Sequence, residues 1–258
     1  MKTRSNNPFA AAVELRQSIG WNNPSDFSLK EVAGSLGICI KEVPSMGSEG
    51  RILMSRDSGV ISINSTNNNL KKNNFTIAHE IGHFLLHKDL ALCVDTQTTL
   101  SEWHIKGPQE TQANDFASEL LMPSDLFCSK IDRKRLNIAL MQEVSTYFNV
   151  SMLAAFLKYV LIGNYPLMIV FMESGLVKWK KCSQDFPFQF LPIKSAVPAY
   201  TVAGDYFYHN KLESEPEEID AIEWFPEDYK IKYDKDRKIW EQCYKVAENG
   251  MVSCLWTN

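Results

Sequence analysis

The chain has 258 residues, of which 45% are hydrophobic, and its formal net charge is −4. This length can form one large domain or two smaller ones, and the hydrophobic content is sufficient to bury a core. The slight acidic excess argues against a general electrostatic attraction to nucleic acid or to anionic membranes. No apolar run reaches the length of about eighteen residues that a membrane span needs, and we recognise no secretion signal, so we expect a cytoplasmic protein without a membrane partner.

Two helices and a small sheet are expected in the first part of the chain. Helical patterns cover residues 8–19 and 28–37, and each is followed or ended by a glycine. Residues 38–43 alternate in polarity and predict a strand. Residues 51–54 and 60–63 flank a turn-rich string and predict a hairpin. We expect these strands to form a small antiparallel sheet, whose edge would suit an extended peptide.

The string FTIAHEIGHFLLH follows this sheet and predicts a helix with metal-binding residues. His79 and His83 are four residues apart, so both imidazoles project from one helix face and can reach one ion. Glu80 can take a proton from a zinc-bound water. Gly82 leaves room for another backbone near the metal. The alternative is a pair of ordinary core histidines, and we expect His87 to cap the end of the helix.

A second informative string, ETQANDFASELLMP, starts at Glu110. Its apolar residues recur at helical spacing, and Glu110 precedes them on the same inward face. They are Ala113, Phe116, Ala117, Leu120 and Leu121. A carboxylate that faces a core needs a partner, and a metal held by two histidines would be one. The alternative is that Glu110 is an N-terminal helix residue stabilised by the helix dipole. Glu119 lies off the apolar stripe and is the weaker candidate.

Taken together, the two strings resemble the ImmA/IrrE family of bacterial and phage-borne zinc metallopeptidases, over about residues 11–163. The resemblance implies that His79, His83 and Glu110 bind Zn²⁺ and that Glu80 is the catalytic base. It also implies limited cleavage of a partner protein, commonly a helix-turn-helix transcriptional repressor. Such cleavage would derepress a mobile-element, stress-response or phage-defence operon.

Other functions remain open beside this one. The zinc site could be structural or regulatory, in a non-proteolytic sensor or an antitoxin-like binding module. Residues 135–163 predict two helices with Ser151 as an N-cap, in a helix-turn-helix-like arrangement. A DNA-binding regulator would use the second helix, where Lys158 is the one residue suited to base contacts. Nucleic acid therefore stays open as a partner or as an activating signal, although we favour a buttressing role for these helices.

Two residues between the strings have candidate roles. Cys93 follows the metal-binding helix, and its thiolate could act as an inhibitory fourth zinc ligand. The alternative is an apolar anchor for the loop. His104 could contact the oxyanion or the substrate, or could be an ordinary solvated histidine. The six cysteines include no CxxC pair, so we expect neither a disulfide framework nor a zinc knuckle.

The last third of the chain is aromatic and rich in strand patterns. A hairpin is expected over residues 166–180, a helix over 195–209 and a final strand over 251–256. The fold class is therefore α+β, with a mostly helical zincin-like peptidase core that carries the small sheet. We divide the chain into the core (1–130), the helix-turn-helix-like segment (131–164) and a C-terminal α+β domain (165–258). The family resemblance implies a sensory character for this last domain.

Overall fold

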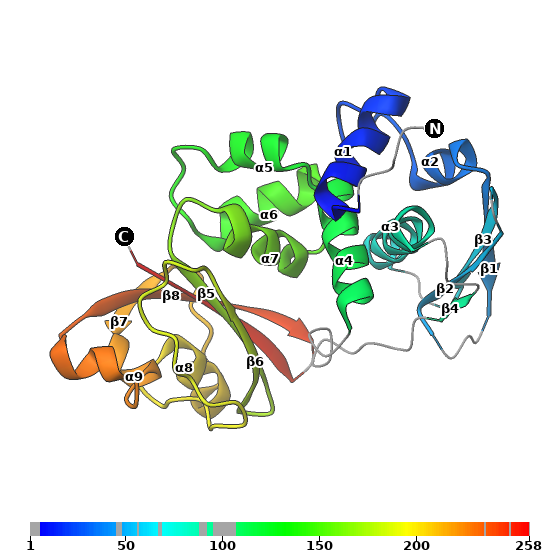
Figure 1. Cartoon of the computed structure of the whole chain (residues 1–258). Coiled ribbons are helices and arrows are strands. Elements are labelled where there is room, and N and C mark those ends of the chain that lie inside the picture. The colour runs from blue at the N-terminus through cyan, green and yellow to red at the C-terminus, as the bar shows by residue number, and fades with distance from the viewer. Residues whose placement is uncertain are drawn as a thin grey trace. The chain divides into compact units, whose positions relative to one another are not determined.

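The computed structural model divides the chain into two compact units, whose elements are labelled in Figure 1. Unit 1 comprises Met1–Phe127 and Val144–Ala154, and unit 2 comprises Cys128–Glu143 and Ala155–Asn258. The division into three parts that we expect from the sequence differs from these two units and stays a prediction. The structure describes residues 6–44, 48–55, 57–66, 69–87, 92–94 (backbone only), 107–234, 236–247 and 249–257.

Unit 1 contains a four-stranded sheet with the strand order β1-β3-β2-β4. The strands β2 and β3 form the expected antiparallel hairpin, whereas β1 runs parallel to β3, so the sheet is mixed and not wholly antiparallel. The reason is burial: β3 is buried along most of its length and takes a central place, while the more exposed β1 takes an edge. The bounds are β1 (Ile38–Val43), β2 (Gly50–Met54), β3 (Gly59–Asn64) and β4 (Leu92–Val94).

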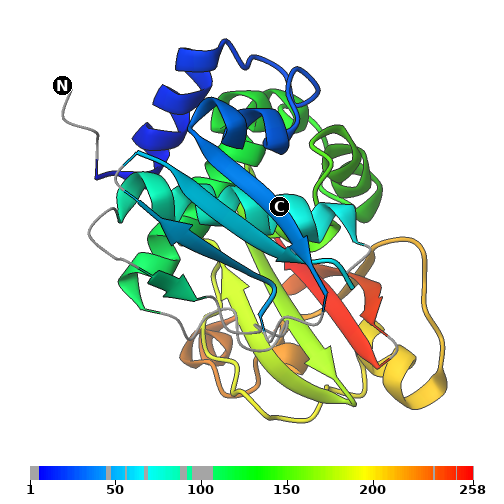
Figure 2. The ribbon, with the colours of Figure 1, turned by 90° about the vertical axis from the view of Figure 1, so that its right-hand side faces the viewer.

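Four helices accompany this sheet, and local capping explains where the first two begin and end. The Asn7 side chain accepts hydrogen bonds from two amides at the start of α1, and Gly20 ends that helix with φ 69°. Ser28 and Glu31 form a capping box at the start of α2. The sheet covers α3 through β2 and β3 (Figure 2), and α4 packs against both α1 and α3. The bounds are α1 (Pro8–Ile19), α2 (Leu29–Ser35), α3 (Leu70–Leu86) and α4 (Pro108–Leu121).

The next three helices each contain residues of both units: α5 (Ser124–Ile131), α6 (Ile138–Tyr147) and α7 (Met152–Ile162). The axes of α6 and α7 differ by 105°, which lies in the range of helix-turn-helix motifs. Ser151 is the expected N-cap, because its hydroxyl accepts a hydrogen bond of 3.1 Å from the Ala154 amide. In the described part of the chain no single helix could span a membrane, and α6 and α7 pass that test by length and composition only as a bent pair.

Unit 2 is built on a five-stranded antiparallel sheet with the strand order β6-β5-β9-β8-β7. The expected hairpin and the expected final strand are both present. Ser174 and Gly175 form the hairpin turn with φ of 52° and 76°, as a tight hairpin requires. The bounds are β5 (Leu167–Glu173), β6 (Leu176–Cys182), β7 (Glu217–Asp220), β8 (Lys238–Ala247) and β9 (Gly250–Trp256).

Short helices cover this second sheet: α8 (Val202–His209), α9 (Ala221–Trp224) and a 3₁₀ helix (Tyr229–Tyr233). Helix α8 is shorter than the expected helix over 195–209, because the Thr201 side chain caps it by accepting a hydrogen bond from the Gly204 amide. Both units combine helices with sheets, so the expected α+β class is confirmed.

A buried carboxylate connects α8 to the sheet of unit 2. Glu241 on β8 has no exposed surface and accepts hydrogen bonds from the amides of Val202 (2.9 Å) and Ala203 (3.3 Å). The Ser253 hydroxyl on β9 donates a third bond of 2.7 Å. These bonds satisfy two amides at the first turn of α8, where a carboxylate is also favoured by the helix dipole. Burial nevertheless raises the pKa of the Glu241 carboxyl above its usual value, because desolvation outweighs these bonds.

Candidate metal centre

Helix α3 holds two histidines and one glutamate in the interior of unit 1. All nine residues from Thr76 to Phe84 are buried, so the helix has no solvent-exposed side over this stretch. His79 and His83 project from the same face, as their spacing of four residues predicts. Their exposed fractions are 4% and 2%, and Glu80 has none. Such deep burial of three ionisable side chains is typical of a functional site.

Helix α4 approaches α3 closely because α3 has a glycine at the point of contact. A Cβ atom on Gly82 would lie 3.2 Å from Cα of Ala113 and 3.0 Å from the Phe116 ring. The expected close passage of a second backbone is therefore present, and that backbone belongs to α4. This contact brings Glu110, one turn before Ala113, towards the two histidines.

Three side chains from the two helices converge on one point. Nε2 of His79 lies 3.0 Å from Nε2 of His83, and the Glu110 carboxylate oxygens lie 3.3 Å and 3.2 Å from these two nitrogens. Ligands at about 2.0–2.1 Å from a tetrahedral zinc ion are roughly 3.3 Å apart. The cluster of His79, His83 and Glu110 therefore has the dimensions and the donor types of a metal site.

The electrostatics of the cluster also suit a cation. Burial favours the neutral form of the His83 ring and lowers its pKa, although Glu110 opposes this effect. Burial by itself would raise the pKa of the Glu110 carboxyl, but hydrogen bonds with His79 and His83 outweigh burial and bring the pKa well below its usual value. At neutral pH the cluster therefore offers a neutral imidazole at His83 and an ionised carboxylate, which are the forms that bind metals.

The outer nitrogens of both histidines have partners that the sequence reasoning missed. Nδ1 of His79 lies 2.9 Å from Oδ1 of Asn114, and Nδ1 of His83 lies 3.0 Å from Nδ1 of His87. His87 in turn places Nε2 2.9 Å from Oε1 of Gln112. His87 does occupy the C-cap position of α3, but its ring is buried and contacts His83 and Gln112. The spacing of Asn114, four residues after Glu110, was the available signal for a second contact on the same face.

Glu80 lies next to the sheet, beside the first residue of β2. A Cβ atom on Gly50, the first residue of β2, would approach Oε1 of Glu80 to 3.3 Å and would clash with the Thr76 side chain. The backbone of β2 therefore passes directly beside the glutamate that the sequence assigns as the base.

The remaining candidates lie elsewhere or outside the described residues. Glu119 is buried but caps α5, since its carboxylate accepts hydrogen bonds from the Ser124 amide (3.0 Å) and hydroxyl (2.6 Å). Cys93 belongs to β4, opposite Ile52, and its side chain is not among those the structure describes. His104 also lies outside the described residues.

The helix suggested for DNA contacts does not expose its one cationic side chain. Lys158 on α7 is only 1% exposed. The other side chain of α7 with a hydrogen-bonding group is Tyr159, which is fully buried. Base recognition needs exposed donors or acceptors on the helix that enters the groove. The burial of these two residues argues against base contacts by α7, and the buttressing role of α6 and α7 stays a prediction.

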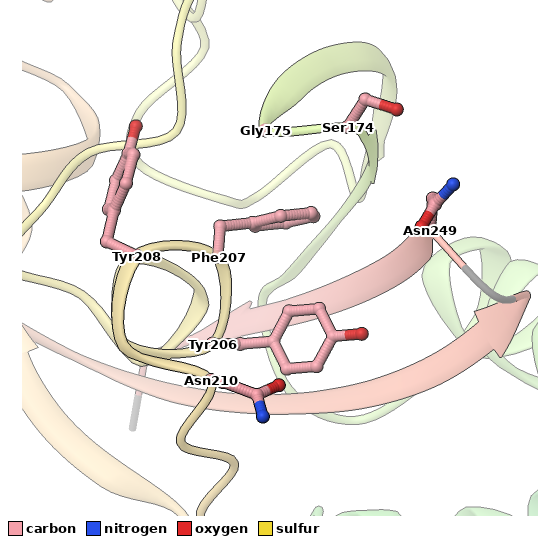
Figure 3. A pocket seen from close by; sticks show the side chains of 7 residues that line it. All are labelled: Ser174, Gly175, Tyr206, Phe207, Tyr208, Asn210 and Asn249. Atoms are coloured by element: carbon pink, nitrogen blue, oxygen red, sulfur yellow. The ribbon is translucent and has the colours of Figure 1, made fainter.

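Unit 2 contains a separate open hollow of about 490 Å³. In Figure 3 the side chains of Tyr206 and Phe207 extend from α8 on one side, and Ser174 and Asn249 lie across from them. Its aromatic and amide groups have no metal-ligating character. A sensory role for this unit stays a prediction.

Comparison with known proteins is consistent with the fold and the metal cluster. A mixed sheet that covers a helix with two histidines, and a second helix that brings a carboxylate to them, define a zincin-like metallopeptidase domain. Residues 34–158 match the family model Peptidase_M78, described as the IrrE N-terminal-like domain. This match confirms the resemblance to ImmA/IrrE proteins over residues 34–158.

A solved structure described as a Mycobacterium tuberculosis transcriptional regulator is similar over most of the chain. The TM-score is 0.64 at 15% sequence identity, and the match covers 96% of this chain and 76% of that one. At this identity the likeness concerns the fold alone. No curated protein matches the sequence.

Proposed function

We propose that the chain is a zinc-dependent endopeptidase. The observation that carries this proposal is the convergence of His79, His83 and Glu110 within 3.0–3.3 Å of one another, on the same helix pair as a fully buried Glu80. Structural zinc sites have four protein ligands, whereas catalytic sites have three and leave one position for water. Among the described residues the cluster has three, which favours catalysis over a structural or purely sensory site.

Each residue has a defined task in this proposal. His79, His83 and Glu110 would hold the ion, whose chemistry would be to acidify a water molecule and to polarise the peptide carbonyl. Glu80 would act as the base that accepts a proton from the attacking water and returns it to the leaving amine. The burial of Glu80 keeps bulk water away from its carboxylate.

We further propose that the substrate is a partner protein, most directly a helix-turn-helix repressor, cleaved at a limited number of sites in the cytoplasm. The match to the Peptidase_M78 family model supports a protein substrate. The similar solved structure is described as a transcriptional regulator, which agrees with a role in transcription. Cleavage would derepress a mobile-element, stress-response or phage-defence operon.

Co-expression with the helix-turn-helix regulator encoded beside the chain tests this function. The wild type, Glu80→Gln and the surface control Glu14→Gln are compared by the size of the regulator and by bound zinc. We expect cleavage by the wild type and by the control, and a rate lower by about 10²–10⁴ in Glu80→Gln with zinc retained. Undiminished cleavage by Glu80→Gln would remove Glu80 from the proposed mechanism.

A further inference from the structure

The hydrogen bonds behind His83 form a relay that the proposed mechanism does not use. The relay runs from the Gln112 amide on α4 through the His87 ring to the His83 ring on α3, with distances of 2.9 Å and 3.0 Å. His83 and His87 are 2% and 9% exposed, so the bond between the two rings is shielded from water, and the bond to Gln112 is partly shielded. Both nitrogens of His87 are engaged, which excludes this ring as a further ligand of the cluster.

The direction of the hydrogen bonds in this relay determines which nitrogen of His83 carries its proton. Oε1 of Gln112 can only accept, so Nε2 of His87 must carry a proton and donate it. A neutral His87 then has its lone pair on Nδ1 and accepts from Nδ1–H of His83. When a metal replaces the contact between Nε2 of His83 and Glu110, this leaves the lone pair of His83 on Nε2, the atom that faces the cluster.

Hydrogen bonds that ran in the opposite direction through the relay would prevent His83 from binding a metal. If the amide group of Gln112 donated to His87, then His87 would donate from Nδ1 to His83. The proton of a neutral His83 would then lie on Nε2 and occupy the position of the metal bond. The side-chain orientation of Gln112, two steps away from the cluster, would therefore decide whether Nε2 of His83 is free to bind a metal.

We propose that Gln112 and His87 are positioning residues that hold His83 in its metal-binding tautomer and ring orientation. The proposal rests on the proposed function, since it assumes a metal at the cluster. Partners of this kind typically change metal affinity by about 10–100-fold. Helix α4 thereby supplies the third ligand, Glu110. It also supplies Gln112, which sets the tautomer of the second ligand, His83.

Zinc affinity, measured by competition with a chromophoric chelator, tests the relay separately from proteolysis. His87→Leu and Gln112→Leu remove the acceptors, whereas in His87→Asn the side-chain oxygen takes the place of Nδ1. Gln112→Glu retains an oxygen that can only accept. Thr111→Ala, an exposed position on the same turn of α4, is the matched control. Thermal unfolding of the metal-free proteins shows whether a variant has simply lost stability.

We expect zinc affinity to fall by about 10–100-fold in both leucine variants and to be largely retained in His87→Asn, Gln112→Glu and the control. Long-range ¹H–¹⁵N correlation spectra of the zinc-loaded wild type should place the His87 proton on Nε2. Equal affinity in all variants, equal losses in His87→Leu and His87→Asn, or a His87 proton on Nδ1 would each overturn the relay. If the wild type itself bound no zinc, the metal site of the proposed function would fail and the relay with it.

Discussion

Nδ1 of His79 lies 2.9 Å from Oδ1 of Asn114, which places a side chain of α4 directly behind a metal-binding residue of α3. The amide oxygen can only accept, so it holds the His79 proton on Nδ1 and leaves Nε2 for the metal. We predict that Asn114→Ala weakens zinc binding by about 10–100-fold, while Asn114→Asp, which keeps the acceptor, does not. Chelator competition measures both, and equal affinity of Asn114→Ala and the wild type would contradict this role.

A second prediction concerns the contact between α3 and α4 at Gly82. An added Cβ would press on the Ala113 backbone and the Phe116 ring, so we expect Gly82→Ala to lower the free energy of unfolding by about 1–3 kcal/mol. Zinc affinity should fall too, because Glu110 moves with α4.

Gly34 is the matched control for this substitution, since apart from its chain neighbours and the backbone of its own helix α2 no atom lies within 4 Å of the position of its Cβ. Gly34→Ala should raise the stability by about 0.5–1 kcal/mol. Denaturant unfolding compares the two variants. An unchanged free energy of unfolding in Gly82→Ala would show that α3 and α4 leave room for a methyl group at this contact.

The approach of β2 to α3 gives a third prediction. In Gly50→Ala the new methyl group would clash with Cγ2 of Thr76 and crowd Glu80, so we expect lower stability and slower cleavage. Thr76→Ser removes Cγ2, and the double variant should recover most of both losses. A double-mutant cycle measures this coupling. Additive effects of the two substitutions would indicate that Thr76 is not the obstacle.

A fourth prediction uses the raised pKa of the buried Glu241 in unit 2. Because folding raises this pKa, the carboxyl contributes most to stability below its unfolded pKa of about 4.3 and loses that contribution as the pH rises through the folded value. The difference in unfolding free energy between the wild type and Glu241→Gln should therefore decrease from about pH 4 to pH 7. Denaturant titrations at several pH values measure it, and a difference that grows with pH would contradict the assignment.

Local signals in the sequence predicted much of the fold. Helix α1 begins and ends where Pro8 and Gly20 indicate, because capping depends on neighbouring residues only. The expected antiparallel pairing of β1 was wrong, because β1 runs parallel to β3. The alternation of polar and apolar residues identifies a strand, but it does not identify the neighbouring strand or its direction.

The metal cluster followed from the sequence more readily than its surroundings did. His79 and His83 share a helix face by spacing alone. The apolar stripe made Glu110 a candidate beside its alternative as an N-terminal helix residue, and the family resemblance decided for the ligand. The partners Asn114 and Gln112 depend on how α4 docks against α3, and no local pattern encodes that geometry. The burial of Lys158 likewise depends on tertiary packing, which overrides the expectation for a cationic residue on a helix.

The central claim is that three side chains of α3 and α4 hold one zinc ion, and elemental analysis of the purified chain tests it most directly. We predict about one zinc ion per chain in the wild type and in Glu80→Gln, and strongly reduced zinc in Glu110→Ala after dialysis. Wild-type protein without zinc, or zinc retained in full by Glu110→Ala, would contradict the claim.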